Sequence, residues 1–401
     1  MRGDTRMELN EAVIVSAVRT PIGSFRGVLS GVAATKLGSV VIAEALKRAE
    51  LKEADIDQVI MGNVLSAGLG QAPARQAALG AGLPKAVECL TVNKVCGSGL
   101  KAVMLAAQSI SLGEAEVVVA GGMENMTNAP YLLPKARDGY RMGHGALVDS
   151  MIKDGLWDVY NDFHMGAAAE LCAKRFAISR KEQDEFAALS YRRAQAAQRN
   201  GNFAKEIVSV VTAARDHQEH VVTEDEEVGK FDLEKMKSLR PAFREDGTVT
   251  AGNASSISDG AAALVVMSRR KASELGIQPL VGIKSWSSTS REPEWFTLAP
   301  AQAITALLKQ RGDSLTDVDL FEINEAFAVA SIAVNRELGL NPERVNVRGG
   351  AIALGHPIGA SGARILTTLI HTMNDLGKRQ GIAALCIGGG EAVAMMGERA
   401  Y

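Results

Sequence analysis

Short apolar runs bounded by glycine recur along the chain and alternate with amphipathic stretches. The stretches at residues 37–49 and 99–112 repeat their apolar positions at helical spacing, whereas the short runs are continuous and rich in Val, Ile and Ala. Continuous runs of this length are typical of strands buried on both faces. The alternation predicts an α/β fold with a mostly parallel sheet that helices cover on both sides. The runs are residues 12–17, 58–61, 115–120, 261–267 and 382–387.

An internal repeat divides the chain. The acidic elements at residues 55–57 (DID) and 317–319 (DVD) lie 262 residues apart. A Val-Asn pair precedes CGSG at 96–99 in one half and GASG at 359–362 in the other, and each half closes on a glycine-rich strand exit. Several matches in the same order predict two copies of one α/β unit packed together.

The middle of the chain has no counterpart in the repeat, and it is more charged and irregular than its flanks. Its length and mixed content favour an insertion rather than a linker. We therefore expect residues 1–124 plus 251–278 to form the N-terminal half. Residues 125–250 are expected to form an inserted loop domain, and residues 279–401 the C-terminal half.

Length, charge and cysteine content exclude several classes of protein. The 401 residues suggest two to three domains. Forty-four Lys and Arg against 46 Asp and Glu argue against a nucleic-acid binder. Four cysteines do not make a disulfide framework, and no uninterrupted apolar run approaches the length of a membrane span. The first residues lack the apolar core of a signal peptide, Met7 offers an alternative start, and the last residues carry no retention signal. We expect a cytoplasmic protein.

Cys96 lies in residues 93–99 (NKVCGSG), directly before the amphipathic stretch at 99–112. A thiol at the start of a helix faces unpaired N–H groups and the positive end of the helix dipole, which favour the thiolate. The flanking glycines allow a substrate to approach the backbone closely. Cys96 is therefore a candidate nucleophile, and the alternative is a small buried cysteine in a tight turn.

A second glycine-rich turn, residues 355–362 (GHPIGASG), opens the stretch at 363–373 that is predicted to be helical. Helix starts bind anions, so a phosphate-binding loop is one interpretation. The Lys-Ser/Thr pair of a Walker loop is missing, however, and the glycine spacing matches no dinucleotide fingerprint. His356 is the better candidate for a functional group, although an isolated histidine is more often structural or at the surface.

Two further candidates stand at predicted strand ends. Cys386 ends an apolar run before three glycines, where it is a second reactive thiol, a core cysteine or a redox partner of Cys96. Asn324, in residues 322–327 (EINEAF), positions a water, stabilises an oxyanion or simply forms a turn. The Cys and His spacings do not match a zinc site, so no metal site is predicted.

Together these blocks resemble the thiolase family over essentially the whole chain. The matching blocks, in family order, are CGSG at 96–99, NEAF at 324–327, GHPIGASG at 355–362 and CIGGG at 386–390. SAVRTP at 16–21 and GNAS at 252–255 also look like family blocks. The resemblance implies a duplicated fold of two βαβ-rich halves in a layered αβαβα arrangement, with a loop domain inserted in the first half.

The resemblance also implies an activity, the reversible ping-pong condensation of two acetyl-CoA molecules to acetoacetyl-CoA and CoA. Cys96 would carry the acyl group as a thioester. His356 would accept the Cys96 proton and, with a water held by Asn324, would steady the thioester oxygen of the incoming CoA ester. Cys386 would move the α-proton of acetyl-CoA. The N–H groups of Cys96 and Gly388 would form the oxyanion hole of the acyl-enzyme.

By the same resemblance, CoA and acetyl-CoA are substrates that lie across the inserted domain, and no tightly bound cofactor is implied. Potassium is not supported, because the cation-binding pattern is incomplete. Bacterial biosynthetic relatives offer an Arg close to where this chain reads VGK at 228–230, so Lys230 is either a nucleotide contact or a surface charge. The residues expected to contact CoA are Leu156, His164, Met165, Lys230, Phe231, Lys235, Ser255, Ala326 and Phe327.

Chain-length preference and partners follow from the resemblance as well. Phe296 stands where many short-chain relatives place Met, and with the His164-Met165 segment it would restrict the pocket to short acyl groups. A homotetramer built as a dimer of dimers is implied, with neither nucleic acid nor membrane as partner. A degradative 3-ketoacyl-CoA thiolase of broader chain length is the nearest alternative. Ketoacyl synthases share the fold but use Cys-His-His, which Cys386 contradicts, and a non-catalytic acyl-CoA carrier or scaffold is a remote alternative.

Overall fold

One ten-stranded sheet runs through the computed structural model, which describes residues 9–213 and 219–399. Met7, the alternative start, and the last two residues of the chain lie outside the described residues. All five predicted apolar runs overlap strands of this sheet. In spatial order, the strands are β14 (Leu320–Ile323), β15 (Gln380–Ile387), β16 (Glu391–Arg399), β13 (Val281–Ser290), β1 (Ala12–Arg19), β12 (Ser258–Ser268), β5 (Val117–Asn125), β3 (Gln58–Gly62) and β4 (Glu88–Val92), and β2 (Gly23–Ser24) pairs with β12.

The prediction of a mostly parallel sheet is wrong. β3 pairs in parallel with β4 and β5, and β14 in parallel with β15, at the two ends of the sheet. The strands between them, from β5 through β12, β1, β13 and β16 to β15, all pair antiparallel. Helices cover both faces of these strands too, so a continuous apolar run reports burial on both faces and not strand direction.

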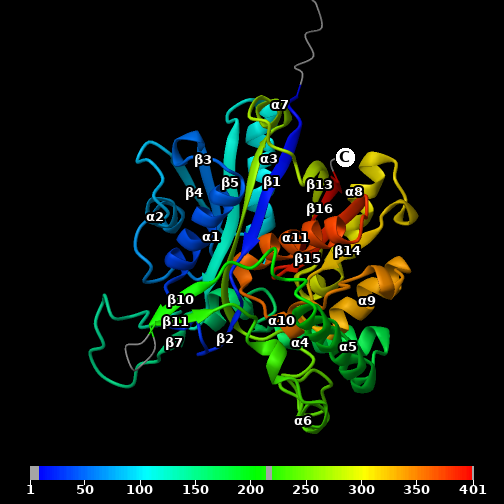
Figure 1. Cartoon of the computed structure of the whole chain (residues 1–401). Coiled ribbons are helices and arrows are strands. Elements are labelled where there is room, and N and C mark those ends of the chain that lie inside the picture. The colour runs from blue at the N-terminus through cyan, green and yellow to red at the C-terminus, as the bar shows by residue number, and fades with distance from the viewer. Residues whose placement is uncertain (1–8, 214–218, 400–401) are drawn as a thin grey trace, which may run out of the picture.

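The helices complete five layers, as the resemblance to thiolases implied. Helices α1 (Ala34–Arg48) and α2 (Pro73–Gly80) cover the outer face of the N-terminal strands, and α8 (Ala299–Arg311) and α9 (Ala328–Leu338) cover the C-terminal strands. Helices α3 (Ser98–Leu112) and α11 (Ile358–Asp375) lie between the two halves, in the central apolar core (Figure 1). The short helices α7 (Arg269–Glu274) and α10 (Ala351–Leu354) connect larger elements.

Glycines allow α3 and α11 to touch at their N-terminal ends. A Cβ atom on Gly99 would lie 2.7 Å from the backbone nitrogen of Ala363, and one on Gly362 would lie 2.3 Å from that of Leu100. Both positions therefore need glycine for the helices to pack this closely. Because Cys96 and His356 each stand just before one of these helices, this contact brings the two turns together.

By length and composition alone, the segment Val95–Leu112 could cross a membrane, a possibility that a search for uninterrupted apolar runs does not reveal. The segment contains Lys101 and forms α3. Most of it is buried between the two halves of the sheet, which accounts for its apolar composition.

The internal repeat is confirmed. The 3-10 turns Glu53–Asp55 and Leu315–Asp317 lie 262 residues apart and precede β3 and β14. The carboxylate of Asp57 accepts the backbone N–H groups of the first residue of β5 and of the residue before it, and Asp319 does the same at the start of β15. The same acidic side chain therefore ties the corresponding strands together in each copy.

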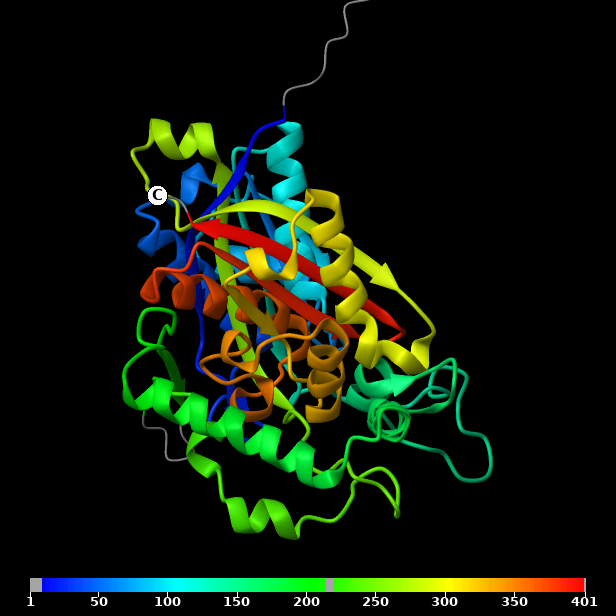
Figure 2. The same cartoon turned by 90° about the vertical axis from the view of Figure 1, so that its right-hand side faces the viewer.

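Between β5 and β12 the chain forms a separate region at one end of the layers, the lower end in Figure 1 (Figures 1 and 2). A buried ion-pair network fastens it to the sheet: Arg19, at the end of β1, lies 2.6 Å from Glu206 and 2.7 Å from Asp225. Removing Arg19 would leave two buried carboxylates without their paired cation. The elements of this region are β6 (Tyr131–Leu132), β7 (Val148–Asp149), a π-helical turn (Met151–Leu156), β8 (Trp157–Asp158), β9 (Phe163–His164), α4 (Met165–Phe176), α5 (Arg180–Arg199), β10 (Val210–Ala213), β11 (Glu219–Val222) and α6 (Leu233–Ser238).

Candidate active site

A tight turn between β4 and α3 carries Cys96. Val95, the residue before it, has a φ of 44°, a left-handed conformation that a β-branched residue rarely adopts. The N–H of Val95 donates to Asn93 Oδ1 at 3.0 Å. Ser98 Oγ accepts the N–H of Lys94 at 2.8 Å and donates to the Val95 carbonyl at 2.6 Å. Strain that surrounding hydrogen bonds hold in place is typical of functional turns.

Cys96 is half-buried and is a thiol at rest. Burial raises its pKa to about 11, and the backbone N–H groups of Gly388 and of Cys96 itself offset only part of that rise. The charge of Glu124 raises the pKa as well. The expectation that the helix start favours a thiolate is therefore wrong for this site, because the loss of water outweighs the helix dipole.

Glu124, at the exit of β5, is a buried carboxylate that joins the two halves beneath Cys96. It accepts the N–H of Val64 at 3.0 Å and that of Leu65 at 3.2 Å in the first half, and that of Gly359 at 2.9 Å in the second. Burial raises its pKa to about 7. Sequence reasoning missed this residue; the available signal was an acidic side chain at the end of an otherwise apolar strand.

His356 stands in the matching turn before α11. Gly355 has a φ of 107°, and a Cβ there would lie 2.4 Å from Ser258 Oγ. The imidazole Nδ1 lies 2.6 Å from Ser361 Oγ and 3.4 Å from Asn324 Nδ2. Nε2 is buried and has no hydrogen-bond partner among the described residues. Burial lowers the pKa of His356 to about 3, so the ring is a neutral base with one nitrogen available.

Cys386, at the end of β15, faces the same space as Cys96. The residue is 2% exposed, and burial raises the pKa of its thiol; a thiolate at Cys96 would raise it further. The turn that follows needs glycine: Gly390 has a φ of 85°, and a Cβ on it would lie 2.3 Å from the carbonyl oxygen of Arg291. This turn brings the N–H of Gly388 within hydrogen-bonding reach of Cys96.

Backbone contacts connect these groups into one site. The N–H of Asn324 donates to the carbonyl of Ala384, two residues before Cys386, at 2.9 Å. Cys96 packs against an apolar cluster that contains Ile358, two residues after His356. The structure thus brings together all five residues expected in the catalytic centre, which come from four separate turns.

An aromatic group lies beside Cys386, on the side of the inserted region. His164 stacks on Phe243 with ring centroids 4.8 Å apart, and the Phe243 ring meets that of Phe327 edge-on at 6.3 Å. Ser255 donates its N–H at 3.0 Å and its hydroxyl at 2.9 Å to the carbonyl of Ala326. Met165 and Cys386 belong to the same apolar cluster. Of these, Phe243 was missed; in a chain with 4% aromatic residues, a phenylalanine close to the GNAS block was the signal.

The remaining residues expected to contact CoA lie outside this aromatic group. Phe231 stacks on Tyr191 at 4.6 Å, in a different cluster beside α5. The ammonium group of Lys230 is 2.6 Å from Ser24 Oγ and pairs with two glutamates of its own turn. Lys235 is exposed on α6, and Leu156 is half-buried in the π-helical turn.

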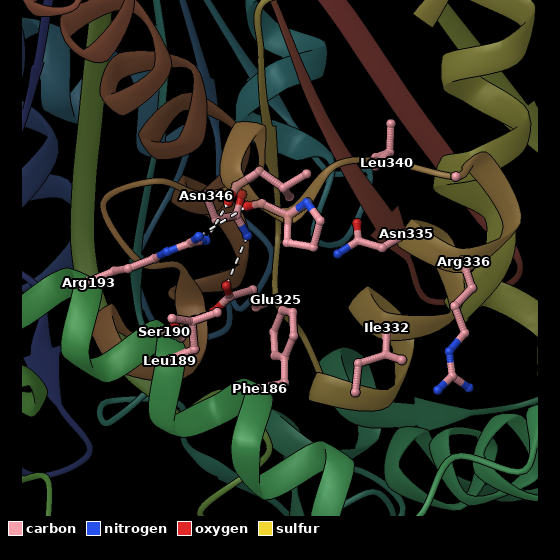
Figure 3. Close-up of a pocket in the computed structure, with 13 residues that line it drawn as sticks. Phe186, Leu189, Ser190, Arg193, Glu325, Ile332, Asn335, Arg336, Leu340 and Asn346 are labelled. Atoms are coloured by element: carbon pink, nitrogen blue, oxygen red, sulfur yellow. Dashed lines mark hydrogen bonds between the residues drawn. The ribbon is translucent and has the colours of Figure 1, made fainter.

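A cavity of about 490 Å³ lies between α5 and α9 (Figure 3). The carboxylate of Glu325 accepts hydrogen bonds there from Ser190 at 2.7 Å and from Asn346 at 2.9 Å. Of the described residues, those that line the cavity include neither thiol nor His356, so it lies behind the Asn324 turn and not at the reaction centre. No group of three or more His, Cys, Asp or Glu side chains with metal-binding geometry occurs in residues 9–213 and 219–399.

Comparisons with known proteins agree with this geometry. Residues 12–270 match the model of the thiolase N-terminal domain and residues 277–399 that of the thiolase C-terminal domain. Acetyl-CoA acetyltransferase 2 of Arabidopsis thaliana is 56% identical over 388 residues, which are 96% of each chain. The acetyl-CoA acetyltransferase of Cupriavidus necator is 53% identical over 98% of this chain and 100% of its own. The crystal structure of the Bacillus anthracis acetyl-CoA acetyltransferase superimposes with a TM-score of 0.96 at 43% identity. The superposition covers 98% of this chain and 100% of the Bacillus anthracis chain. The chain belongs to the thiolase family.

Proposed function

We propose that the protein is an acetyl-CoA acetyltransferase that interconverts two acetyl-CoA molecules with acetoacetyl-CoA and CoA. The observation that carries the proposal is the convergence of two thiols, the half-buried Cys96 and the buried Cys386, with the turn that carries a neutral His356. Relatives with this printed activity match nearly the whole chain at 52–56% identity, which supports the same assignment.

In the cleavage direction, Cys96 attacks the 3-keto carbon of acetoacetyl-CoA and its proton passes to Nε2 of His356. The thiol has a pKa of about 11 and the imidazole one of about 3. Burial raises the first pKa and lowers the second, so both groups are neutral at rest and the proton leaves Cys96 as its sulfur attacks.

The carbon–carbon bond then breaks, and its electron pair leaves as the enolate of acetyl-CoA. The thiol of Cys386 gives its proton to the α-carbon, which suits a buried group that is protonated at rest. After acetyl-CoA departs, the thiol of an incoming CoA loses its proton to the Cys386 thiolate and attacks acetyl-Cys96. Cys96 recovers its proton from His356 as the second acetyl-CoA forms. Condensation follows the same steps in reverse.

Negative charge on the reacting oxygens is stabilised at two places. The N–H groups of Gly388 and Cys96 already reach the sulfur of Cys96, so they stand where the oxygen of its thioester would lie. On the other side, Asn324 Oδ1 and His356 Nε2 are buried polar atoms without a partner in the described part of the chain. Asn324 Oδ1 would hold a water by accepting one of its hydrogens. The other hydrogen of that water, together with the N–H of His356 Nε2 once it is protonated, would donate to the thioester oxygen of the second substrate.

CoA binds across the inserted region, residues 125–250, in this proposal. The aromatic group of His164, Phe243 and Phe327 packs against the pantetheine arm, and Ser255 and Ala326 meet its amides. Lys230 is already held by Glu226 and Glu227, which leaves Lys235 and its neighbours on α6 as the more accessible nucleotide contacts. CoA and acetyl-CoA are substrates, and no resident cofactor is required by these steps.

The side chains packed beside Cys386 favour a short acyl chain. Phe296 is 3% exposed and meets Phe327 edge-on at 6.4 Å, so two rings fill the space that a longer chain would need. The test compares kcat/KM for cleavage of acetoacetyl-CoA with that for 3-ketoacyl-CoAs of about twelve to sixteen carbons. We expect a strong preference for acetoacetyl-CoA, and a preference for the long chains would assign a degradative thiolase instead.

A homotetramer in the cytoplasm completes the proposal. β4 is an edge strand of the sheet and exposes Leu90, which favours pairing with a second chain. The segment around β6 and β7 exposes Tyr131, Leu133 and Met142, and it supplies a second contact surface. The four cysteines, all within the described residues, are free thiols, as a reducing compartment requires. Light scattering on the purified protein tests the tetramer, and a monomer would contradict it.

A further inference from the structure

The buried hydroxyl of Ser361, in the first turn of α11, makes two polar contacts. Its Oγ lies 2.9 Å from the carbonyl oxygen of Pro357 and 2.6 Å from Nδ1 of His356. The residue is fully buried, so water does not compete for either contact. A hydroxyl has one proton to donate, and a carbonyl oxygen can only accept. The Ser361 hydroxyl therefore donates its hydrogen bond to the Pro357 carbonyl, and Oγ accepts a hydrogen bond from the N–H of Nδ1.

The other copy of the repeated unit shows the same arrangement without an imidazole. Ser98 occupies the matching place in CGSG and is also fully buried. Its Oγ donates to the carbonyl of Val95 at 2.6 Å and accepts the backbone N–H of Lys94 at 2.8 Å. Each serine hydroxyl thus donates to a backbone carbonyl and accepts from an N–H group. In the second copy that N–H is on the His356 ring.

We propose that Ser361 is a positioning residue that fixes the neutral His356 ring with its proton on Nδ1. Nε2 then keeps a lone pair for the proton of Cys96, a role that rests on the proposed function. With the opposite tautomer Nε2 would carry a hydrogen and could not accept that proton. With the Nδ1 hydrogen directed at Ser361 Oγ, Nδ1 has no free lone pair for the amide nitrogen of Asn324, 3.4 Å away, so that long contact does not hold the ring.

The direct test is solid-state 15N NMR at neutral pH on microcrystals of the full chain labelled at histidine, with His356 assigned by its loss in His356→Gln. We expect a protonated Nδ1 and an unprotonated Nε2 in the unmodified protein, and both forms populated in Ser361→Ala. A protonated Nε2 in the unmodified protein would overturn the proposal. This measurement involves no turnover, so its result is independent of whether the proposed activity is correct.

Kinetics supply the second test. Ser361→Ala should lower kcat for acetoacetyl-CoA cleavage roughly ten- to hundredfold while KM stays within about twofold, and Ser361→Thr, which keeps the hydroxyl, should recover most of it. Thr372→Val is the matched control, because Thr372 is a buried hydroxyl on α11 that donates to the carbonyl of Thr368 at 2.7 Å. An unchanged kcat in Ser361→Ala, or an equal loss in the control, would contradict the role. If Ser361→Ala does not fold, the spectrum of the unmodified protein decides.

Discussion

The turn before α3 and the turn before α11 stand at matching places in the two copies of the α/β unit, yet they present different groups. The first offers the Cys96 sulfur from a strained backbone, with Val95 at a φ of 44°. The second offers an imidazole from a glycine-rich backbone, with Gly355 at a φ of 107°. Each turn keeps a buried serine at the start of its helix. The duplicated unit thus supplies two helix starts that meet. In the proposed function the residue before the first is the nucleophile, and the residue before the second is the base.

Loss of the first turn's sulfur should have the largest effect. Cys96→Ala removes the only group assigned to carry the acyl intermediate, so kcat should fall by about 10⁴-fold or more while the fold persists. Steady-state cleavage of acetoacetyl-CoA measures it. Cys89→Ala, at a half-buried thiol on the edge strand β4, is the control and should keep its activity.

Loss of the second turn's base should cost less, because it removes proton transfer and leaves the nucleophile. His356→Gln should lower kcat by roughly 10²- to 10⁴-fold. His144→Gln, at an exposed histidine, is the control. Equal activity in His356→Gln and the unmodified protein would show that His356 is not the base that accepts the Cys96 proton.

The protonation state of the Cys96 thiol, in the first turn, can be followed directly. Because burial raises the pKa of Cys96 to about 11, its alkylation by iodoacetamide should accelerate roughly tenfold for each pH unit between about 7 and 9. Rates come from mass spectrometry of the peptide that contains Cys96. A plateau below pH 8 would mean that the helix start does stabilise a thiolate at Cys96.

The smallest expected effect is on chain-length preference, and it comes from Phe296 beside Cys386. Phe296→Ala opens space beside Phe327 and Cys386, so cleavage of six- to eight-carbon 3-ketoacyl-CoAs should improve several-fold relative to acetoacetyl-CoA, by about 1 kcal/mol or more of differential binding. The ratio of kcat/KM values for the two chain lengths measures it. Tyr160→Ala, at an exposed ring, should leave the ratio unchanged.

Much of the fold could be predicted from local pattern. The apolar runs marked β1, β3, β5, β12 and β15, and the 262-residue offset located β3 and β14. Strand direction could not be predicted, since strands covered on both faces look alike in parallel and antiparallel sheets. The pKa of Cys96 was predicted in the wrong direction because a sequence shows the helix start but not the loss of water around it.

At the candidate site, motifs identified the candidate reactive residues that the structure brings together, and missed residues that contact them or their turns. Cys96, His356 and Cys386 stand in glycine-rich turns that are conspicuous in a sequence. Glu124 and Phe243 act through contacts with residues far along the chain, which only the folded structure brings together. The expected CoA contact Phe231 has the right residue type, but it packs on Tyr191 beside α5.

The most direct measurement is to incubate the protein with acetyl-CoA, without a second substrate, and to locate the modification by peptide mass spectrometry. A single acetyl group on the peptide that contains Cys96, absent from Cys96→Ala and removed by added CoA, is the predicted result. Acetyl on Cys386 instead, or no thioester at all, would contradict the assignment of the nucleophile to the first turn.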